Sequence, residues 1–346
     1  METTESSEKR EKTYPEVMLT GDRPTGKLHL GHYVGSMQNR LLLQDQYDQL
    51  FYMIADVQGL TDNFDNPAKI RENLREVLLD NLAVGIDPEK VTMFVQSQIP
   101  EIAELTVFFL NLVTVARLRR NPTVKSEMEQ KGYGDRVPAG FFMYPVSQAA
   151  DILFCKGTII PVGEDQIPMV EQTNEIAHKF NSIYGEIFPY VKPLVGTTGR
   201  LVGIDGGAKA SKSLGNAIYL ADAPDEIERK VMSMYTDPDH IHVADPGKVK
   251  GNVVFEYLDI FDTRTNEIAE LKTQYAHGGL GDVVLKKRLI EVLRSILDPI
   301  RERRELLAQD PANLDAILQN GITEAREVAS RTMDEVRSAM GIHYFK

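Results

Sequence analysis

Apolar residues in the first part of the chain occur in short runs that alternate with longer stretches of helical periodicity. Runs of this kind predict strands over Val17–Thr20, Leu50–Ala55 and Val91–Gln96. Between the last two runs, Asn66 can cap a helix, Pro67 can open it and Gly85 is a natural end. Strands that alternate with helices favour a parallel sheet with crossover connections, which is the doubly wound α/β class.

A second cycle of the same kind follows, and then the pattern changes. The further predicted elements are a helix over Glu101–Leu118, a helix around Tyr144–Phe154, a strand over Thr158–Val162 and a helix from Glu164. After Asp222 strand-like runs largely disappear. Apolar residues then recur at three- and four-residue steps at Leu285, Leu289, Leu293, Ile296 and Ile300, and Gly321 and Gly341 are predicted to bracket a last helix. We therefore expect a flexible tail over residues 1–16, a doubly wound domain over 17–222 and an all-helical domain over 223–346.

Composition narrows the class of protein. The 346 residues carry a formal net charge of −12, and the single cysteine is Cys155. A chain with a pI of about 5.2 does not bind nucleic acid over its whole surface, so any RNA contact must be a local basic patch. One cysteine permits no intramolecular disulfide, which fits a reducing compartment. The first 13 residues are unlike a signal peptide and no apolar run could span a bilayer, so we expect a cytoplasmic protein.

A candidate phosphate site follows the first predicted strand. Three glycines, Gly21, Gly26 and Gly31, allow close approach of a ligand, and a helix start there presents free N–H groups to phosphate. His29 and His32 are three residues apart, so both imidazoles can face one spot and donate hydrogen bonds to phosphate oxygens. The alternative is a glycine-rich turn with two surface histidines.

A second glycine-rich segment, Gly206–Ser213, carries two lysines and two hydroxyl groups. Lys209 and Lys212 would add positive charge where a pyrophosphate leaving group gains negative charge. Taken alone, the segment is also typical of a solvated loop. Its combination with the histidine pair, in this order, favours a shared nucleotide site.

Polar residues follow one stripe of the predicted helix around residue 150. Tyr144, Gln148 and Asp151 are four and three residues apart on an otherwise apolar helix. A buried carboxylate needs donors, and a donor without acceptor ability, such as an indole N–H, would be a natural complement for Asp151. The alternative is a core helix whose aspartate caps another segment.

The strand that follows this helix ends in a glycine turn and an acidic helix start. Gly163 gives clearance for a ligand outside the carboxyl end of the strand, and Asp165 can accept hydrogen bonds from ribose hydroxyls. Gln166 can bridge to an amino or carbonyl group. The alternative is a helix N-terminus that carries acids for electrostatic reasons.

Two of these segments resemble the signatures of the class I aminoacyl-tRNA synthetases. His29-Leu30-Gly31-His32 is similar to the HIGH signature and Lys209-Ala210-Ser211-Lys212-Ser213 to KMSKS, with Leu30 and Ala210 as the departures. The resemblance implies a Rossmann-type fold, ATP with Mg²⁺ and an aminoacyl-adenylate intermediate. No metal-binding residue is evident, so Mg²⁺ is expected to arrive with ATP. The residues expected at ATP are Gly21, Arg23, Thr25, Gly26, His29, Gly31, His32, Gly163, Asp165, Lys209, Ser211, Lys212 and Ser213. Of these, the expected catalytic residues are His29, His32, Lys209 and Lys212.

The other two segments resemble the tryptophanyl-tRNA synthetase family, which carries a YP…AADIL segment and a PVGEDQ segment in this order, as at residues 144–153 and 161–166. The likeness runs from about Val17 to the C-terminus and implies activation of L-tryptophan with ATP and its transfer to tRNA(Trp). It implies that Tyr144 and Gln166 hold the tryptophan ammonium group and that Asp151 accepts the indole N–H. The departures are Gln148, where many members have Met, and a loose match at residues 54–59. The residues expected at tryptophan are Leu19, Gly21, Tyr144, Gln148, Asp151, Ile160, Val162 and Gln166.

Two basic clusters depart from the acidic average. The first could meet the tRNA acceptor stem, the alternative being a solvated helix end, and contains Arg117, Arg119, Arg120, Lys125, Lys131 and Arg136. The second lies in the helical part, where the family reads the anticodon, and contains Lys286, Lys287, Arg288, Arg294, Arg301, Arg303 and Arg304. The family is dimeric, and the apolar stretch Leu105–Val115 is either a subunit interface or core.

Three alternatives stay open on the sequence. A tyrosine-tRNA ligase shares the fold and both signatures and differs in the helix around residue 150. A small-molecule nucleotidylyltransferase also uses the histidine pair, although the lysine-rich segment and the helical part disfavour it. A catalytically weakened paralogue with an RNA-binding or regulatory role is the third, because of Ala210 and Gln148.

Overall fold

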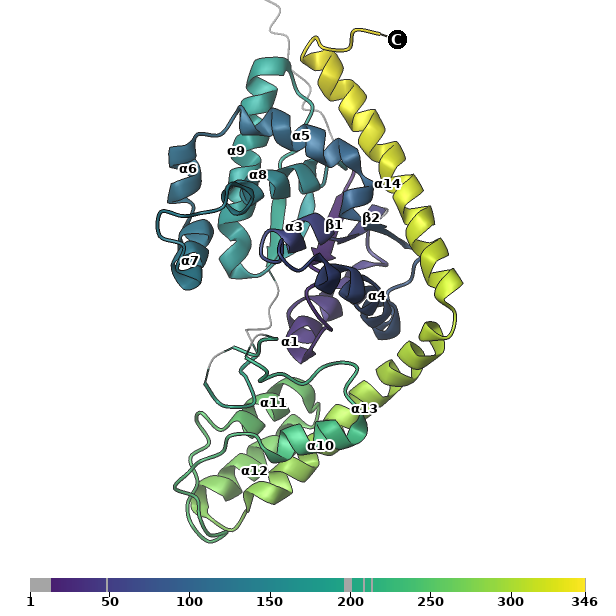
Figure 1. The fold of residues 1–346 in the computed structure, drawn as a ribbon. Coiled ribbons are helices and arrows are strands. Elements are labelled where there is room, and N and C mark those ends of the chain that lie inside the picture. The colour runs from purple at the N-terminus through teal and green to yellow at the C-terminus, as the bar shows by residue number, and fades with distance from the viewer. Residues whose placement is uncertain (1–13, 48, 196–200, 208, 213, 346) are drawn as a thin grey trace, which may run out of the picture.

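The computed structural model describes residues 14–47, 49–195, 201–207, 209–212 and 214–345. At its centre lies one sheet of five parallel strands in the order β3-β2-β1-β4-β5. The strands are β1 (Val17–Asp22), β2 (Gln49–Ile54), β3 (Val91–Val95), β4 (Ile159–Val162) and β5 (Lys192–Val195). Helices connect the strands and cover the sheet (Figure 1), so the predicted doubly wound, Rossmann-type sheet is confirmed.

The order of the strands reverses at β1. Strands β2 and β3 follow on one side of it, and β4 and β5 lie on the other. Strand β1 pairs with β2 from Val17↔Gln49 to Asp22↔Ile54, whereas β1 and β4 share the single registered pair Met18↔Ile159. In open α/β sheets, ligands bind outside the carboxyl ends of the strands at such a reversal. The end of β1 and the end of β4 are therefore the expected walls of a site.

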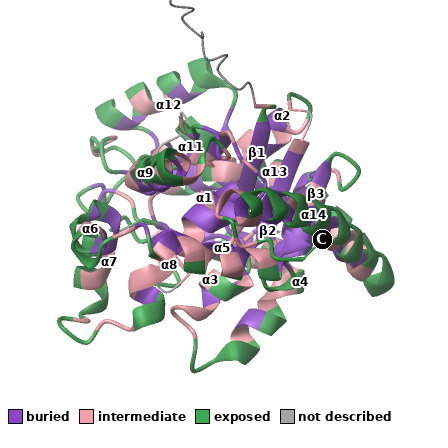
Figure 2. Cartoon of the chain, turned by 90° about the horizontal axis from the view of Figure 1, so that it is seen from above, coloured by how far each residue is buried: buried purple, intermediate pink, exposed green. Residues whose placement is uncertain are grey.

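Alternate strand residues face two helical layers, as the period of two in a strand requires. Met18, Tyr52 and Ile54 face a core shared with α4 and α13, and Leu19 and Phe51 face a core shared with α5, α8, α9 and α14. Figure 2 shows the buried strands between these layers. The helices of this part are α1 (Leu30–His32), α2 (Gln38–Leu43), α3 (Asp56–Leu60), α4 (Pro67–Val84), α5 (Pro100–Leu110), α6 (Val115–Arg120), α7 (Pro122–Lys131), α8 (Ala139–Leu153) and α9 (Ile167–Tyr184).

Local signals in the sequence explain where several of these helices begin and end. The Asn66 side chain caps α4, and Gly85 ends it with a left-handed φ of 118°, as predicted. The helix predicted over 101–118 is instead two helices, because Thr114 caps a new start by accepting from the Arg117 N–H at 3.2 Å. The short edge strand β5 was not predicted.

Helices dominate the chain after residue 222. They are α10 (Pro224–Met232), α11 (Val253–Phe261), α12 (Thr265–His277), α13 (Asp282–Ala308) and α14 (Pro311–Ala339). Helix α13 leads from the group of α10 to α12 back toward the sheet, and α14 then runs along its edge (Figure 1). Along the described ranges, no helix combines the length and apolar character that a membrane crossing needs.

Helix α14 packs directly on β3, and the position of Gly321 within this helix corrects one prediction. Gly321 lies inside this helix and does not bracket its start, since α14 begins at Pro311. A Cβ atom at Gly321 would lie 2.0 Å from the carbonyl oxygen of Met93, so only glycine permits this approach of helix to strand. The last described helix thus packs with the sheet, and the predicted division of the chain at residue 222 stays a prediction.

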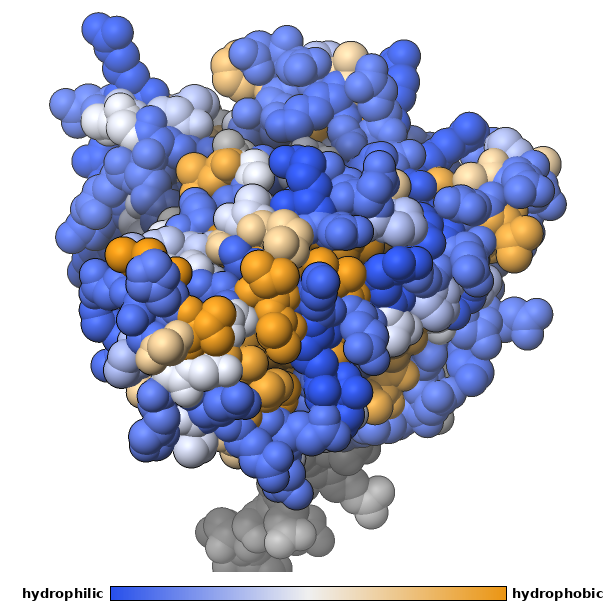
Figure 3. Space-filling view, turned by 90° about the horizontal axis from the view of Figure 1, so that it is seen from below, coloured by the Kyte–Doolittle hydropathy of each residue, from blue (hydrophilic) through white to orange (hydrophobic). Residues whose placement is uncertain are grey.

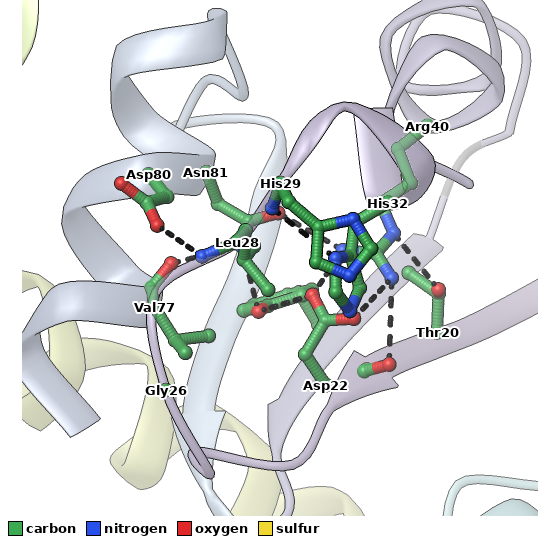
Figure 4. A network of polar contacts seen from close by, with 12 residues as sticks. Thr20, Asp22, Gly26, Leu28, His29, His32, Arg40, Val77, Asp80 and Asn81 are labelled. Carbon is green, nitrogen blue, oxygen red and sulfur yellow. Dashed lines mark hydrogen bonds and ion pairs between the residues drawn. The ribbon is translucent and has the colours of Figure 1, made fainter. Parts of the chain in front are cut away.

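A buried cation fixes the carboxyl end of β1 (Figure 4). The Arg40 side chain, from α2, is 3% exposed and contacts Asp22 at 2.6 Å. It also donates to Thr20 Oγ1 at 3.1 Å and Asn81 Oδ1 at 3.0 Å. Tyr52 donates to the same Asp22 carboxylate at 2.9 Å. The Arg40 charge holds the pKa of Asp22 well below its usual range against the opposing effect of burial.

Replacement of Arg40 by Met should destabilise the protein strongly, because the buried Asp22 carboxylate loses its partner. We expect the free energy of unfolding to fall by about 3–5 kcal/mol, as for other broken buried pairs. Urea unfolding at neutral pH measures it. The matched control is Arg75→Met, which breaks a half-exposed pair with Asp315 at 2.8 Å and should cost less than about 1 kcal/mol. Equal losses in the two variants would refute the role given to Arg40.

Candidate active site

The two predicted histidines lie together at the start of α1, directly after the loop that leaves β1. Their ring centroids are 3.9 Å apart. The Nδ1 atom of His29 accepts from the Gly31 N–H at 3.1 Å, and Nδ1 of His32 accepts from the His29 N–H at 3.2 Å. Both Nδ1 atoms therefore act as acceptors from backbone.

These contacts define the charge and tautomer of the pair. Burial, with the charge of Lys212 next, lowers the pKa of His29 to about 4. Burial, with the charge of His29 next, lowers the pKa of His32 to about 3. Both rings are thus neutral at pH 7, and since each Nδ1 accepts, the proton of each ring lies on Nε2. The pair offers two neutral N–H donors.

The predicted lysine-rich segment reaches the same place. Lys212 Nζ donates to the carbonyl oxygen of Gly26 at 2.6 Å. Ala210 is buried, and its Cβ lies 3.9 Å from the position a Cβ would take on Gly31. Burial lowers the pKa of Lys212 to about 8, which leaves most of its charge at pH 7. Lys209 is exposed. The structure therefore brings the two signature segments together.

The remaining residues predicted at ATP differ in their surroundings. Gly21 faces β2, where a Cβ would lie 2.4 Å from the Met53 carbonyl oxygen. Arg23 pairs with Asp62 at 3.1 Å, and the Thr25 N–H donates to the Arg23 carbonyl in a turn. The Ser211 N–H donates to Asn216 Oδ1 at 2.8 Å. Ser213 lies outside the described residues.

The segment after β4 forms the opposite wall. Gly163 and Asp165 are exposed just after the carboxyl end of β4, and the Gln166 side chain donates to Asp165 Oδ2 at 3.2 Å. Thr123, from α7, donates to the Asp165 carbonyl oxygen at 2.8 Å and so ties this turn to α7. In the described part of the chain, no group of three or more His, Cys, Asp or Glu side chains is arranged to hold a metal ion.

Asp151 is the most enclosed of the predicted residues. It is 2% exposed, on α8. Gln96 Nε2 donates to its Oδ1 at 2.7 Å, and Gln58 Nε2 donates to its Oδ2 at 3.3 Å. The Gln58 N–H in turn donates to Gln96 Oε1 at 3.0 Å, which closes a ring of contacts. Burial raises the pKa of Asp151 to about 7, and the two amides oppose that rise.

Sequence reasoning missed both glutamines of this ring. The available signal was their position, since Gln96 follows β3 directly and Gln58 lies just after β2, at the carboxyl edge where ligands bind. Tyr144 and Gln148 share the face of α8 that carries Asp151, and burial, with the charge of Glu127 next, raises the pKa of Tyr144 above its usual range. The other residues predicted at tryptophan, Leu19, Ile160 and Val162, lie in β1 and β4.

Most residues of the second basic cluster bind other groups of the protein. Lys286 donates to the Met232 carbonyl at 2.9 Å and Arg288 pairs with Asp262 at 2.7 Å. Arg303 and Arg304 bind groups of α4. Lys287 and Arg294 are exposed.

A parallel sheet with neutral histidine donors and a lysine loop at its reversal is the arrangement of a class I aminoacyl-tRNA synthetase. The family model of the class I tRNA synthetases for tryptophan and tyrosine matches residues 11–298, and the chain belongs to this family. The structure is similar to that of tryptophanyl-tRNA synthetase from Campylobacter jejuni in complex with ADP and tryptophan. That similarity has a TM-score of 0.82 at 31% identity and covers 94% of this chain and 99% of the other.

Sequence relatives decide between the two amino acids, tryptophan and tyrosine, that the family model covers. The tryptophan-tRNA ligase of Clostridium longisporum is 59% identical over 334 residues, which are 95% of this chain and 98% of the relative. That of Streptococcus pneumoniae is 55% identical over 337 residues, with coverage of 95% and 98%. The activity of the chain is that of a tryptophan-tRNA ligase.

If Asp151 accepts the indole N–H, as the sequence predicts, tryptophan binding should depend on pH. The pKa of about 7 lies above the usual carboxyl value, so Asp151 is ionised above pH 7 and neutral below it. A carboxylate accepts an N–H more strongly than a neutral carboxyl group does. Tryptophan affinity, measured by calorimetry without ATP, should therefore fall as the pH drops through 7.

Gln96→Leu removes the stronger amide and should move that midpoint to higher pH. At pH 7 we expect binding to weaken by about tenfold, the size of one hydrogen bond to a charged group. Gln98→Leu is the matched control, because Gln98 is exposed and donates to Ser97. A midpoint that is unchanged in Gln96→Leu, or shifted equally in Gln98→Leu, would contradict the ring's role.

Proposed function

We propose that the site at the carboxyl ends of β1 and β4 activates L-tryptophan with ATP and then transfers it to tRNA(Trp). The observation that carries this proposal is the meeting of His29, His32 and Lys212 beside the glycines of one loop. Neutral N–H donors and an ammonium group suit a triphosphate, because they stabilise charge that builds up on phosphate oxygens.

In the first step, the tryptophan carboxylate attacks the α-phosphate in line. A bond from carboxylate oxygen to phosphorus forms, the bond to the β-phosphate breaks, and pyrophosphate leaves. The Nε2–H groups of His29 and His32 donate to phosphate oxygens, and Lys209 and Lys212 balance the leaving charge. The nucleophile is already ionised, so the step needs positioning and charge stabilisation and no general base.

The amino acid is held by the groups on α8 and at the end of β4. Asp151 accepts the indole N–H, while Tyr144 and Gln166 hold the ammonium group. Gly163 leaves room for the adenylate, and Asp165 accepts from ribose. The phosphate-facing groups are donors and cations, which suit phosphate oxygens and not a metal ion. Mg²⁺ would therefore be held by the phosphates, where it supplies charge neutralisation.

The decisive experiment is amino-acid-dependent exchange of pyrophosphate into ATP, with each of the twenty amino acids. We expect exchange with tryptophan, and a loss of at least about tenfold in kcat/KM for tryptophan in Asp151→Ala, because the indole N–H loses its acceptor. A thermal melt of the variant shows whether it is folded. Exchange with tyrosine would overturn the specificity, and tRNA binding without any exchange would favour the weakened paralogue.

In the second step, a terminal ribose hydroxyl of tRNA attacks the adenylate carbonyl carbon. The ester C–O bond forms, the bond from that carbon to the phosphate oxygen breaks, and AMP leaves while its phosphate takes up the hydroxyl proton. Support for an acceptor-stem surface comes from Arg119, Arg120 and Lys125, which are exposed on α6 and α7. Arg117 and Lys131 of the same cluster are paired with Glu175 and Asp62. The tie from Thr123 to Asp165 connects this surface to the site.

The double variant Arg119→Gln, Arg120→Gln should raise the KM for tRNA and reduce its salt dependence, since two phosphate-facing charges are lost. Pyrophosphate exchange should be unchanged. The control is Arg117→Gln, whose charge is already paired with Glu175. Aminoacylation kinetics at several salt concentrations measure both effects. An unchanged KM for tRNA would exclude this surface.

The part formed by α10 to α13 is proposed to bind the anticodon. Figure 3 views the molecule from the end at which these helices lie and shows apolar surface between polar residues. Exposed apolar residues of this part include Ile241, Val243, Val283 and Val284. Helix α13 also carries the exposed cations Lys287 and Arg294, of which Arg294 pairs with Asp298 at 3.2 Å, and exposed positive charge supports contact with RNA phosphates.

A homodimer in the cytoplasm is the proposed form of the enzyme. Within the stretch 105–115, Leu105 and Phe109 are core residues, whereas Val107 is 58% and Val115 60% exposed. The stretch therefore contributes to the core and also presents apolar side chains that a second copy could cover.

A further inference from the structure

One side chain holds the backbone next to the catalytic histidine. Leu28 directly precedes His29, and its N–H donates to Asp80 Oδ2 at 2.8 Å. The Leu28 carbonyl accepts from the Leu220 N–H at 3.0 Å, and the Leu30 N–H donates to Ile218 at 2.9 Å. Two of these contacts are between backbone groups, so Asp80 is the point where a side chain of another element fixes this segment (Figure 4).

Asp80 is held in turn by a residue far along the chain. It is 0% exposed on α4, and its second oxygen, Oδ1, accepts from Arg304 Nε at 2.8 Å. Arg304 lies on α13 and also pairs with Glu76 of α4. Its neighbour Arg303 donates to the Ala83 carbonyl at 2.6 Å. A buried carboxylate whose two oxygens bind two different elements has little freedom to move, because each lost contact would leave a charge unpaired.

We propose that Asp80 and Arg304 are positioning residues that place His29 for ATP. The packing of α13 on α4 then controls the position of the ATP-binding segment. This inference rests on the proposed role of His29 at ATP. Helix α13 also carries Lys287 and Arg294, on the surface proposed for tRNA. A rigid helix and two hydrogen bonds therefore connect the helical part of the enzyme with the histidine pair.

The contacts from Arg304 through Asp80 to Leu28 form a relay. The relay uses other residues than the tryptophan side of the site. Asp151 is held by Gln96 and Gln58, and no described contact links these residues to Asp80 or Arg304. A displaced Leu28 should thus disturb ATP and leave tryptophan bound normally. General loss of structure would weaken both ligands together, so the two explanations can be separated.

The test compares Arg304→Gln, Asp80→Asn and their double variant in pyrophosphate exchange, with calorimetry for tryptophan. We expect each single variant to lower kcat/KM for ATP by about 10- to 100-fold, the usual effect of a small misplacement of catalytic groups. Tryptophan affinity should stay at the native value. The double variant should lose no more than the worse single variant, because both break one relay.

Two further variants complete the design. Arg304→Lys keeps the charge and should restore part of the ATP efficiency. Arg75→Gln is the matched control, because it breaks another pair between α4 and a C-terminal helix, with Asp315 at 2.8 Å, away from Leu28. It should behave as the native enzyme.

Several outcomes would overturn the relay. Parallel losses for ATP and tryptophan that follow the loss of thermal stability would show a merely structural pair. Native ATP kinetics in folded Arg304→Gln and Asp80→Asn variants, while His29→Ala loses ATP efficiency, would refute the relay alone. Native ATP kinetics in His29→Ala would instead refute the proposed ATP site and the relay with it.

Discussion

The carboxyl edge of the sheet depends on one buried cation, Arg40. A guanidinium group at this depth is stable when its donors are matched, and its acceptors come from β1 and α4. Tyr52 adds β2 to the same carboxylate. The end of β1 therefore cannot shift without leaving a charge unpaired. The glycine loop and both histidines follow β1 in the chain, so fixing the end of β1 also fixes the point at which they start.

Different segments supply the hydrogen-bond donors and the positive charge of the site. The start of α1 supplies neutral imidazoles, because burial holds the pKa of both below the physiological range. Lys212 comes from a segment that contacts the loop before α1 at Gly26 and places Ala210 beside Gly31 of α1. The small Ala210 is the departure noted in the sequence, and its burial beside Gly31 explains how a short side chain can still seat the loop.

The sequence predicted what depends on neighbours in the chain and missed what depends on distant ones. Asn66, Gly85 and the strands up to β4 follow from local caps and apolar runs. Strand β5 is short and mostly exposed, so it has no periodic signal. Gly321 resembled a helix boundary because its partner, the backbone of β3, cannot be read from nearby residues. For the same reason the sequence did not predict the contacts of Gln58, Gln96 and Asp80, and it placed Arg304 in a basic cluster at tRNA and not beside Asp80. Both signature segments were found from residue type and spacing, and the role of Asp151 stays a prediction.

The choice of a side chain that carries a hydrogen-bond donor can be argued from the groups around Asp151. Gln96 and Gln58 each direct one amide N–H at this carboxylate. Each amide keeps a second N–H, and the carboxylate keeps further acceptor capacity. An indole N–H can donate to that carboxylate. A purely apolar side chain could not, and a buried polar group left without a partner is costly. Selectivity under the proposed role therefore resides in how the two amides hold Asp151 as much as in Asp151 itself.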